Sequence, residues 1–257
     1  MPEVSWLSIA PVKGLALQHP GEVMLHRHGV TENRRFYIVD EEGLRFGLLR
    51  RGGLVTVGVE YDAHEERLAL RFPDGVAVEG RIALDGEVTT DFYGREVQGR
   101  VVVGPWSRAL SEQFGRSLRL VQSERPGAAV DRGGRGGVTL VSDASVDELE
   151  RQAGAEVDAR RFRMLVGVGG CEPHEEDGWL GGDVRIGEAL VRLVGRVGRC
   201  AITTQNPATG VPNLDTLRTI KGYRGLSDER SIDFGVFGEV VEPGRVRVGD
   251  PVAPRWR

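Results

Sequence analysis

The chain has 257 residues with 34 basic and 38 acidic side chains, and its net charge of −4 argues against a nucleic-acid-binding protein. No apolar run reaches the ~18 residues of a membrane span, and the N-terminus lacks the basic and apolar segments of an export signal. The two cysteines are too few for a disulfide framework or an iron–sulfur cluster, and no dinucleotide fingerprint for NAD or a flavin is present. We therefore expect a cytoplasmic protein without a membrane or nucleic-acid partner.

The first hundred residues predict a succession of short β-strands separated by turns. Val55, Val57 and Val59 alternate with other residues, which is the period of a half-buried strand. The turn residues Pro73-Asp74-Gly75 lie between two apolar alternating runs and predict a β-hairpin. In this part of the chain we expect strands at residues 4–9, 22–28, 35–40, 55–61, 68–72, 76–78 and 97–103.

Helices are predicted at residues 106–114, 145–153 and 214–221. Trp106, Leu110 and Phe114 share one face of the first helix, and Gly115 supplies the glycine that commonly follows a helix. In the second helix, Ser145 and Glu148 have the spacing of a capping box.

The third helix is expected to begin after a capping Asn213 and to end at Gly222. We expect a boundary just before the first helix, which divides the chain into residues 1–104 and residues 105–257. Because the junction is short and apolar, the two parts should pack closely.

The second part predicts further strands between its helices, at residues 138–141, 164–168, 189–194, 234–241 and 245–248. The last two are expected to pair as a hairpin around Glu242-Pro243-Gly244. The fold class is therefore mainly β, an α+β protein of two closely packed β-rich parts with a few short helices.

Two segments of this second part could bind an anion. Residues 126–137 are rich in glycine and arginine, and they predict either a mobile surface loop or a basic flap over an anionic ligand. Ser142 lies where a strand meets a helix N-terminus, and free backbone N–H groups there favour an anion. Helix capping alone is the alternative for this serine.

Three other polar features point to ordinary structure more than to a metal. Cys171 and His174 have zinc-like spacing, but a structural zinc site needs four ligands, so we expect a solvated acidic loop at residues 171–179. His26 and His28 alternate on one strand without a third ligand, as surface histidines do.

Cys200 is the main candidate for chemistry. It follows the apolar run 189–194, and Arg196 and Arg199 precede it within four residues. Positive charge lowers the pKa of a thiol and favours the thiolate, the form that attacks electrophiles and binds soft metals. The alternative is a small buried apolar residue, which free cysteine usually is.

Seven motifs follow one another over nearly the whole chain. They are Ile9-Ala10-Pro11-Val12-Lys13-Gly14, Gly29-Val30-Thr31-Glu32-Asn33-Arg34-Arg35-Phe36, Arg161-Phe162-Arg163, Glu176-Asp177-Gly178-Trp179, Ile186-Gly187, Arg199-Cys200-x-x-Thr203-Thr204-x-x-Pro207-x-Thr209-Gly210 with Leu217 and Tyr223 after it, and Gly249-Asp250-Pro251-Val252. In this order they resemble the MOSC family, named after the C-terminal domain of molybdenum cofactor sulfurase. By this resemblance residues 1–104 are the family's N-terminal β-barrel domain and residues 105–257 are the MOSC domain.

The resemblance implies a mostly β fold that holds a molybdenum cofactor, Mo-molybdopterin, between the two domains. In the amidoxime-reducing members the cysteine at the position of Cys200 is the protein ligand of molybdenum, which suits a soft, redox-active centre. The phosphate of the pterin requires cations or free N–H groups. The candidates for cofactor binding are Lys13, Arg34, Arg50, Ser142, Arg163, Arg199 and Thr203.

The chain departs from the family at three polar positions. Asn33 replaces an aspartate, Leu165 replaces an asparagine, and only Arg50, after a one-residue shift, could stand for the arginine of a threonine-x-arginine motif. Three functions follow from the residues and the resemblance: a molybdenum oxidoreductase that reduces N-hydroxylated compounds, a sulfur carrier with a persulfide on Cys200, and a binding module without cofactor.

A reductase of this kind would take a small-molecule substrate. Because the chain carries no electron-transfer group of its own, its electrons would come from an external donor protein of the ferredoxin or flavoprotein kind.

Overall fold

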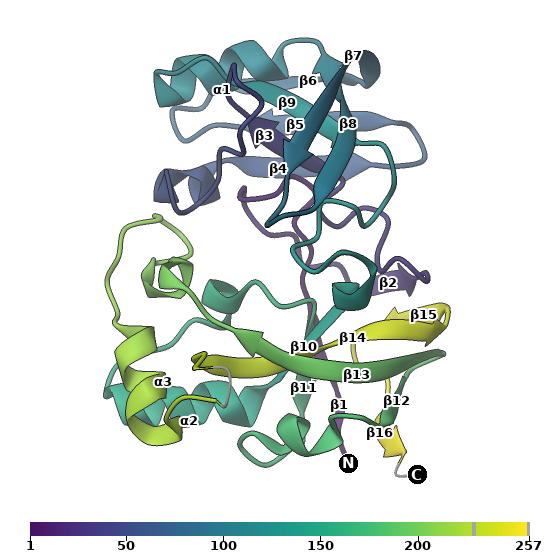
Figure 1. The fold of residues 1–257 in the computed structure, drawn as a ribbon, viewed down its shortest axis with the longest axis vertical. Coiled ribbons are helices and arrows are strands. Elements are labelled where there is room, and N and C mark those ends of the chain that lie inside the picture. The colour runs from purple at the N-terminus through teal and green to yellow at the C-terminus, as the bar shows by residue number, and fades with distance from the viewer. Residues whose placement is uncertain (228–229, 256–257) are drawn as a thin grey trace.

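The computed structural model describes residues 1–227 and 230–255, and it has two lobes stacked along the long axis (Figure 1). The strands are β1 (Glu3–Leu7), β2 (Glu22–Leu25), β3 (Phe36–Val39), β4 (Gly58–Asp62), β5 (Arg67–Arg71), β6 (Ala77–Arg81), β7 (Ala83–Asp91), β8 (Glu96–Val103), β9 (Arg119–Ser123), β10 (Val138–Ser142), β11 (Val166–Gly169), β12 (Asp183–Ile186), β13 (Ala189–Gly198), β14 (Asp233–Glu242), β15 (Gly244–Arg247) and β16 (Val252–Arg255). The α-helices are α1 (Trp106–Phe114), α2 (Asp143–Ala153) and α3 (Thr216–Arg224). Short 3-10 helices are η1 (Gly52–Thr56), η2 (Gly133–Gly136), η3 (Ala159–Phe162), η4 (Glu175–Trp179) and η5 (Ala201–Thr204). The predicted mainly β fold class is confirmed.

The barrel lobe consists of β1, β2, β10–β16, α2 and α3. Its seven-stranded sheet has the order β1-β11-β10-β14-β13-β12-β16. The backbone N–H of Val4 donates to the carbonyl of Asp250 at 2.8 Å, and that of Val252 donates to the carbonyl of Pro2 at 2.9 Å. These bonds bring the two edge strands together, so the sheet is nearly closed around a core of aliphatic side chains.

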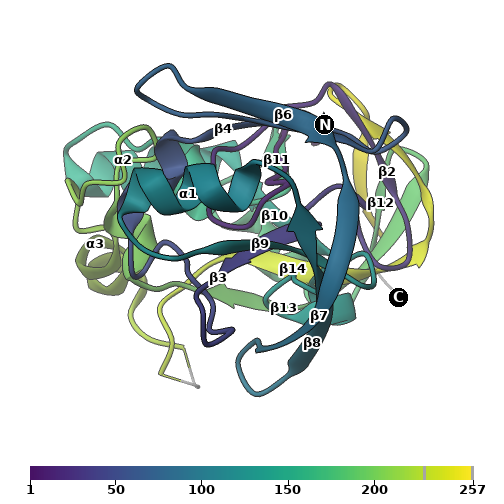
Figure 2. The same ribbon diagram turned by 90° about the horizontal axis from the view of Figure 1, so that it is seen from above.

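The N-terminal lobe consists of β3–β9 and α1. A four-stranded sheet, β3-β9-β8-β7, and a three-stranded sheet, β4-β5-β6, enclose α1 between them (Figure 2). Trp106 is 1% exposed at the start of α1, and its indole N–H donates to the carbonyl of Leu68 at 3.2 Å. The predicted helix 106–114 is confirmed, and Gly115 follows it with a φ of +63°.

The two lobes exchange segments of the chain. β1 and β2 come before the N-terminal lobe in sequence, but β1 pairs with β11 and β2 pairs with β15. α1 and β9, which follow residue 104, belong to the N-terminal lobe. The expected division between residues 104 and 105 stays a prediction about folding units.

Several predicted elements are displaced or absent. The prediction of a C-terminal hairpin is wrong, because β15 pairs with β2 and not with β14. η1 occupies the start of the predicted strand 55–61, so β4 begins only at Gly58. The predicted hairpin around Pro73-Asp74-Gly75 is confirmed as β5 and β6. The sequence patterns missed β7, β9, β12 and β16.

The helix caps also differ from the predicted ones. Ser142 caps α2, because its hydroxyl oxygen accepts from the backbone N–H of Ser145. The capping alternative for Ser142 is therefore confirmed, and the cap lies three residues before Ser145, where the capping box was expected to begin. Asp215, and not Asn213, caps α3 in the same way, and Gly222 lies inside that helix. Over the described residues, no helix is long and apolar enough to cross a membrane.

Candidate functional site

A cavity of about 420 Å³ lies between the two lobes. Its walls contain all but one of the side chains predicted for the site, namely Lys13, Arg34, Arg50, Arg163, Arg199, Cys200 and Thr203. Segments far apart in the sequence, from the first motif to the one around residue 200, therefore meet at a single place.

Cys200 lies at the end of β13, in extended backbone just before η5. It is a free thiol and it is exposed, so the alternative of a buried packing residue is wrong. The hydroxyl of Thr203 donates to the carbonyl of Cys200 at 3.0 Å and lies 2.8 Å from the hydroxyl of Thr216. These contacts fix the turn that presents the thiol.

Arg199 holds the backbone around the thiol. Its guanidinium donates to the carbonyls of Phe162 at 3.0 Å and of Phe234 at 2.8 Å. Burial, with a smaller effect of Arg132, lowers the pKa of Arg199 to about 9. The side chain thus ties η3 and β14 to the end of β13, and its donors are used for structure.

Arg161 supports the loop after the thiol, a role that the sequence patterns did not assign. It is 5% exposed, and it donates to the carbonyl of Gln205 and to the amide oxygen of Asn213, each at 2.7 Å. The motif Arg161-Phe162-Arg163 is the sequence signal for this role, although only its last arginine is predicted as a site residue.

Lys13, Arg34 and Arg163 form a cationic wall. The Lys13 ammonium lies 2.5 Å from a carboxylate oxygen of Asp131. Arg163 donates to the carbonyl of Leu15 at 2.7 Å, and both arginines have a positive φ, which few non-glycine residues adopt. Burial lowers the pKa of Lys13 to about 8 and, with Arg34 nearby, that of Arg163 to about 9.

The cavity has an excess of positive charge. In the described part of the chain its walls contain eight basic side chains and two carboxylates. Asp131 is one of these carboxylates; although burial acts to raise its pKa, Lys13 and Arg34 lower it to about 2. The lowered pKa values of these half-buried cations indicate desolvation that nearby acidic groups do not offset, and an anionic ligand would offset it. The wall therefore fits a phosphate-bearing cofactor.

Arg50 and Ser142 are placed differently. Arg50 lines the cavity but pairs with the buried carboxylate of Asp40 at 3.0 Å. Ser142 is not among the cavity walls, and its backbone N–H donates to a carboxylate oxygen of Glu176 at 3.3 Å. The hydroxyl of Ser145 donates to the same carboxylate at 2.9 Å. The predicted anion position at the start of α2 thus contains the protein's own carboxylate.

Comparison with known proteins identifies the family of the second half of the chain. A family model described as MOSC domain matches residues 129–253, which include the cation Arg163 and the thiol Cys200. Residues 129–253 of the chain are a MOSC domain. The mitochondrial amidoxime-reducing component 1 of Xenopus laevis is 28% identical over 281 residues, which covers 97% of this chain and 81% of that relative. The mitochondrial amidoxime reducing component 2 of Bos taurus is 26% identical over 253 residues, which covers 88% and 74%.

One human relative aligns over a shorter segment. The mitochondrial amidoxime-reducing component 1 of Homo sapiens is 33% identical over 120 residues, 44% of this chain and 35% of that relative. Among solved structures, the YUAD protein from Bacillus subtilis covers 98% of this chain and 94% of its own, with 14% identity and a TM-score of 0.48.

The departures from the MOSC pattern have structural roles in this chain. Asn33 is 4% exposed, and its amide oxygen accepts from the backbone N–H of Ala10 at 3.0 Å, so it holds the first motif beside the second. Leu165 is 2% exposed and belongs to the aliphatic core of the barrel. Neither residue lines the cavity.

Residues 126–137 pack against the cavity and are not a detached surface loop. Ala129 is fully buried, and Arg95 donates to the carbonyls of Ala128 at 2.8 Å and Val130 at 2.7 Å. Asp131 and Arg132 face the cavity from this segment. The alternative of a flap along an anion site agrees with this position in the MOSC domain.

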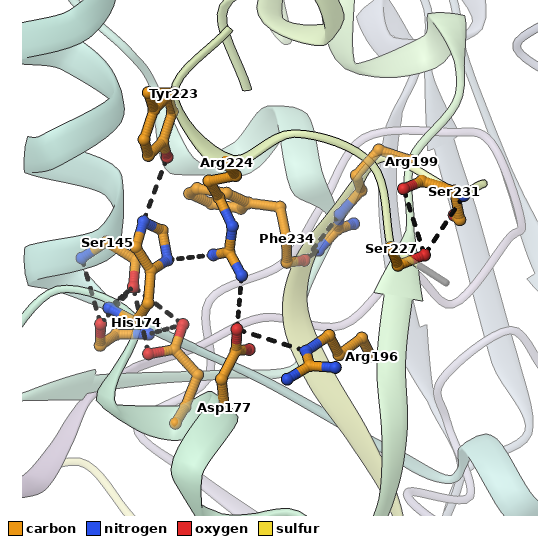
Figure 3. A network of polar contacts seen from close by, with 12 residues as sticks. Ser145, His174, Asp177, Arg196, Arg199, Tyr223, Arg224, Ser227, Ser231 and Phe234 are labelled. Carbon is orange, nitrogen blue, oxygen red and sulfur yellow. Dashed lines mark hydrogen bonds and ion pairs between the residues drawn. The ribbon is translucent and has the colours of Figure 1, made fainter. Parts of the chain in front are cut away.

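α3 connects the thiol turn to a polar network (Figure 3). Thr216, at the start of the helix, bonds to Thr203 beside the thiol. At its end, Arg224 donates to the ring of His174 and to the carboxylate of Asp177, which also pairs with Arg196 at 3.4 Å. In the described residues, no three metal-ligating side chains are grouped to hold an ion. The expectation of a solvated acidic loop here is wrong, since η4 is packed and its residue Glu176 is fully buried.

His174 should make the stability of the MOSC domain depend on pH. Burial, then the charge of Arg224, lowers its pKa from 6.5 to about 4, so the folded state favours the neutral ring. The contribution of the neutral ring to the free energy of unfolding is fully present above pH 6.5 and is lost as the pH falls to about 4. We expect the melting temperature of the wild type to fall over this interval more steeply than that of His174→Asn, which tolerates the positive φ at this position. Parallel curves for the two proteins would contradict this assignment.

Proposed function

We propose that this MOSC domain protein is a molybdenum-dependent oxidoreductase that reduces N-hydroxylated compounds. The observation that carries the proposal is the exposed thiol of Cys200 in one cavity with the half-buried cations Lys13 and Arg163. A thiolate is a ligand for a soft metal, and the cations suit a phosphate. Relatives named amidoxime-reducing components support the reaction class.

In this proposal Cys200 ligates molybdenum through Sγ, and Lys13, Arg34 and Arg163 bind the phosphate of the pterin. When bound, Mo-molybdopterin supplies the two-electron chemistry that removes an N-bound oxygen. Arg199 and Thr203 hold the backbone on either side of the thiol, so its position is fixed before the metal arrives.

The substrate of this reaction would be a small molecule that enters the cavity between the lobes. Electrons would come from an external donor protein of the ferredoxin or flavoprotein kind. The cytoplasmic location stays a prediction, and the relatives have the names of mitochondrial proteins.

Metal analysis of the purified protein tests the proposal. We expect close to one molybdenum per chain and reduction of benzamidoxime when a chemical electron donor is supplied. Protein that takes up no molybdenum in a host making the cofactor would contradict the proposal and would favour the binding module without cofactor.

The exposure of Cys200 also favours a second function, a sulfur carrier with a persulfide at this residue. Intact-protein mass spectrometry separates the two functions. A mass increase of one sulfur on Cys200, without molybdenum, would support the carrier and contradict the reductase.

A further inference from the structure

The turn between β7 and β8 presents an aromatic ring at the mouth of the cavity. Tyr93 and Gly94 are its central residues, with φ values of +58° and +80°, and the backbone N–H of Phe92 donates to the carbonyl of Arg95 at 2.7 Å. A turn with two positive φ values prefers asparagine and glycine, so a tyrosine here costs free energy. The ring of Tyr93 is nevertheless 63% exposed and lines the cavity.

Arg45 is held between two rings in the same place. Its guanidinium carbon lies 4.1 Å from the centroid of Tyr93 and 4.8 Å from that of Phe92. Nε donates to the carbonyl of Asp91 at 2.7 Å. Among the described residues, no hydrogen bond or ion pair uses the two terminal nitrogens of Arg45, and the side chain lines the cavity. A fixed guanidinium with free terminal nitrogens is prepared to bind a carboxylate with two hydrogen bonds.

Two large apolar side chains also line this cavity. Leu44 is 52% exposed and Leu49 is 62% exposed, and both line the cavity. Large apolar side chains with this exposure at a cavity mouth mark a place where an apolar ligand would be buried.

We propose that Arg45, Tyr93, Leu44 and Leu49 form a substrate subsite for planar, apolar N-hydroxylated compounds that bear a carboxylate. The ring of such a substrate packs on Tyr93 and the two leucines, and its carboxylate pairs with Arg45. This inference rests on the proposed reductase function, and it names the substrate class for the same cavity.

The alternative source of an anion for Arg45 is the phosphate of the cofactor. Lys13 lies 5.5 Å from the centroid of Phe92, on which Arg45 also stacks, so the two cations are neighbours. Arg45, however, stacks on the exposed ring of Tyr93 at the mouth of the cavity. The position at the mouth favours the substrate.

The test uses calorimetric titration of the molybdenum-loaded protein with benzamidoxime and with 4-carboxybenzamidoxime. Arg45→Met should weaken binding of the carboxylated probe about tenfold or more, the effect of one charge-assisted pair, and leave the neutral probe unchanged. Tyr93→Asn suits the turn and should fold at least as well, yet weaken both probes by about threefold to tenfold. Arg108→Met, on the outer face of α1, is the matched control for loss of one positive charge.

Molybdenum content separates the sources of the anion. If Arg45→Met lowers molybdenum content together with binding, Arg45 serves the cofactor phosphate and the subsite is refuted. Equal binding of the two probes by the wild type, or an unchanged affinity of Arg45→Met for the carboxylated probe, refutes it as well. If the protein reduces neither probe but binds the carboxylated one through Arg45, the reductase function fails, and Arg45 remains a carboxylate-binding residue of the cavity.

Discussion

Replacement of Cys200 by serine is expected to leave the protein folded while molybdenum and reductase activity are lost together. The thiol is exposed, so the change buries no unpaired hydroxyl, and the melting temperature should stay within about 2 °C of the wild type. An oxygen donor is harder than a sulfur donor, and a hydroxyl loses its proton far less readily than a thiol. Serine is therefore a poor ligand for a soft metal. We expect at least about a hundredfold loss of benzamidoxime reduction.

Cys171→Ser is the matched control for this experiment. Burial, then the charges of Glu175 and Glu176, raises the pKa of Cys171 to about 12, so this thiol is not available as a thiolate at neutral pH. The variant should keep its molybdenum and its activity. A folded Cys200→Ser protein with full activity would end the hypothesis that Cys200 ligates the metal.

Removal of either cation of the wall is expected to weaken cofactor binding about tenfold or more, because each would supply a charge-assisted hydrogen bond to the phosphate. Lys13→Met keeps the length of the side chain. Arg163→Asn keeps a residue that tolerates the left-handed backbone, with its φ of +51°. The measurement is molybdenum per chain in protein purified under identical conditions, with the melting temperature recorded alongside.

Arg108→Met serves again as the control, since that guanidinium pairs with Glu112 on the surface of α1. If Lys13→Met and Arg163→Asn both retain the molybdenum content of the wild type, the cationic wall is not the phosphate site. Unfolding alone would also release molybdenum and would not support the phosphate site. Asn is used at residue 163 because it tolerates the local backbone and should keep the protein folded.

Local patterns predicted many of the elements. Alternation and a glycine turn predicted the β5–β6 hairpin, and the face of Trp106 and Leu110 predicted α1. Pairing between distant segments left no local signal, so the neighbour of β15 was assigned wrongly. Pro243 and Gly244, which follow Glu242, favour a hairpin that the barrel does not contain.

The site was predictable only where motifs carried it. The arginines before Cys200 and the resemblance both indicate that thiol, whereas the resemblance alone indicates Lys13, and the structure brings the two to one cavity. Ser142 was expected to meet a ligand, but the carboxylate of Glu176, 34 residues further along the chain, is already there. Arg45 belongs to no motif, and its stacking on Tyr93 depends on a contact that the sequence does not reveal.

The closure of the barrel has a consequence for the order of events during protein synthesis. β3–β9 and α1 are contiguous, so the N-terminal lobe can fold on the ribosome as soon as β9 has emerged. β1 waits for β11, and residue 3 meets residue 251 only after almost all of the described chain has been translated. Lys13 is translated early and Cys200 late, so the cavity that they line is among the last parts of the molecule to form. Newly made protein would therefore acquire its metal after translation and not during it.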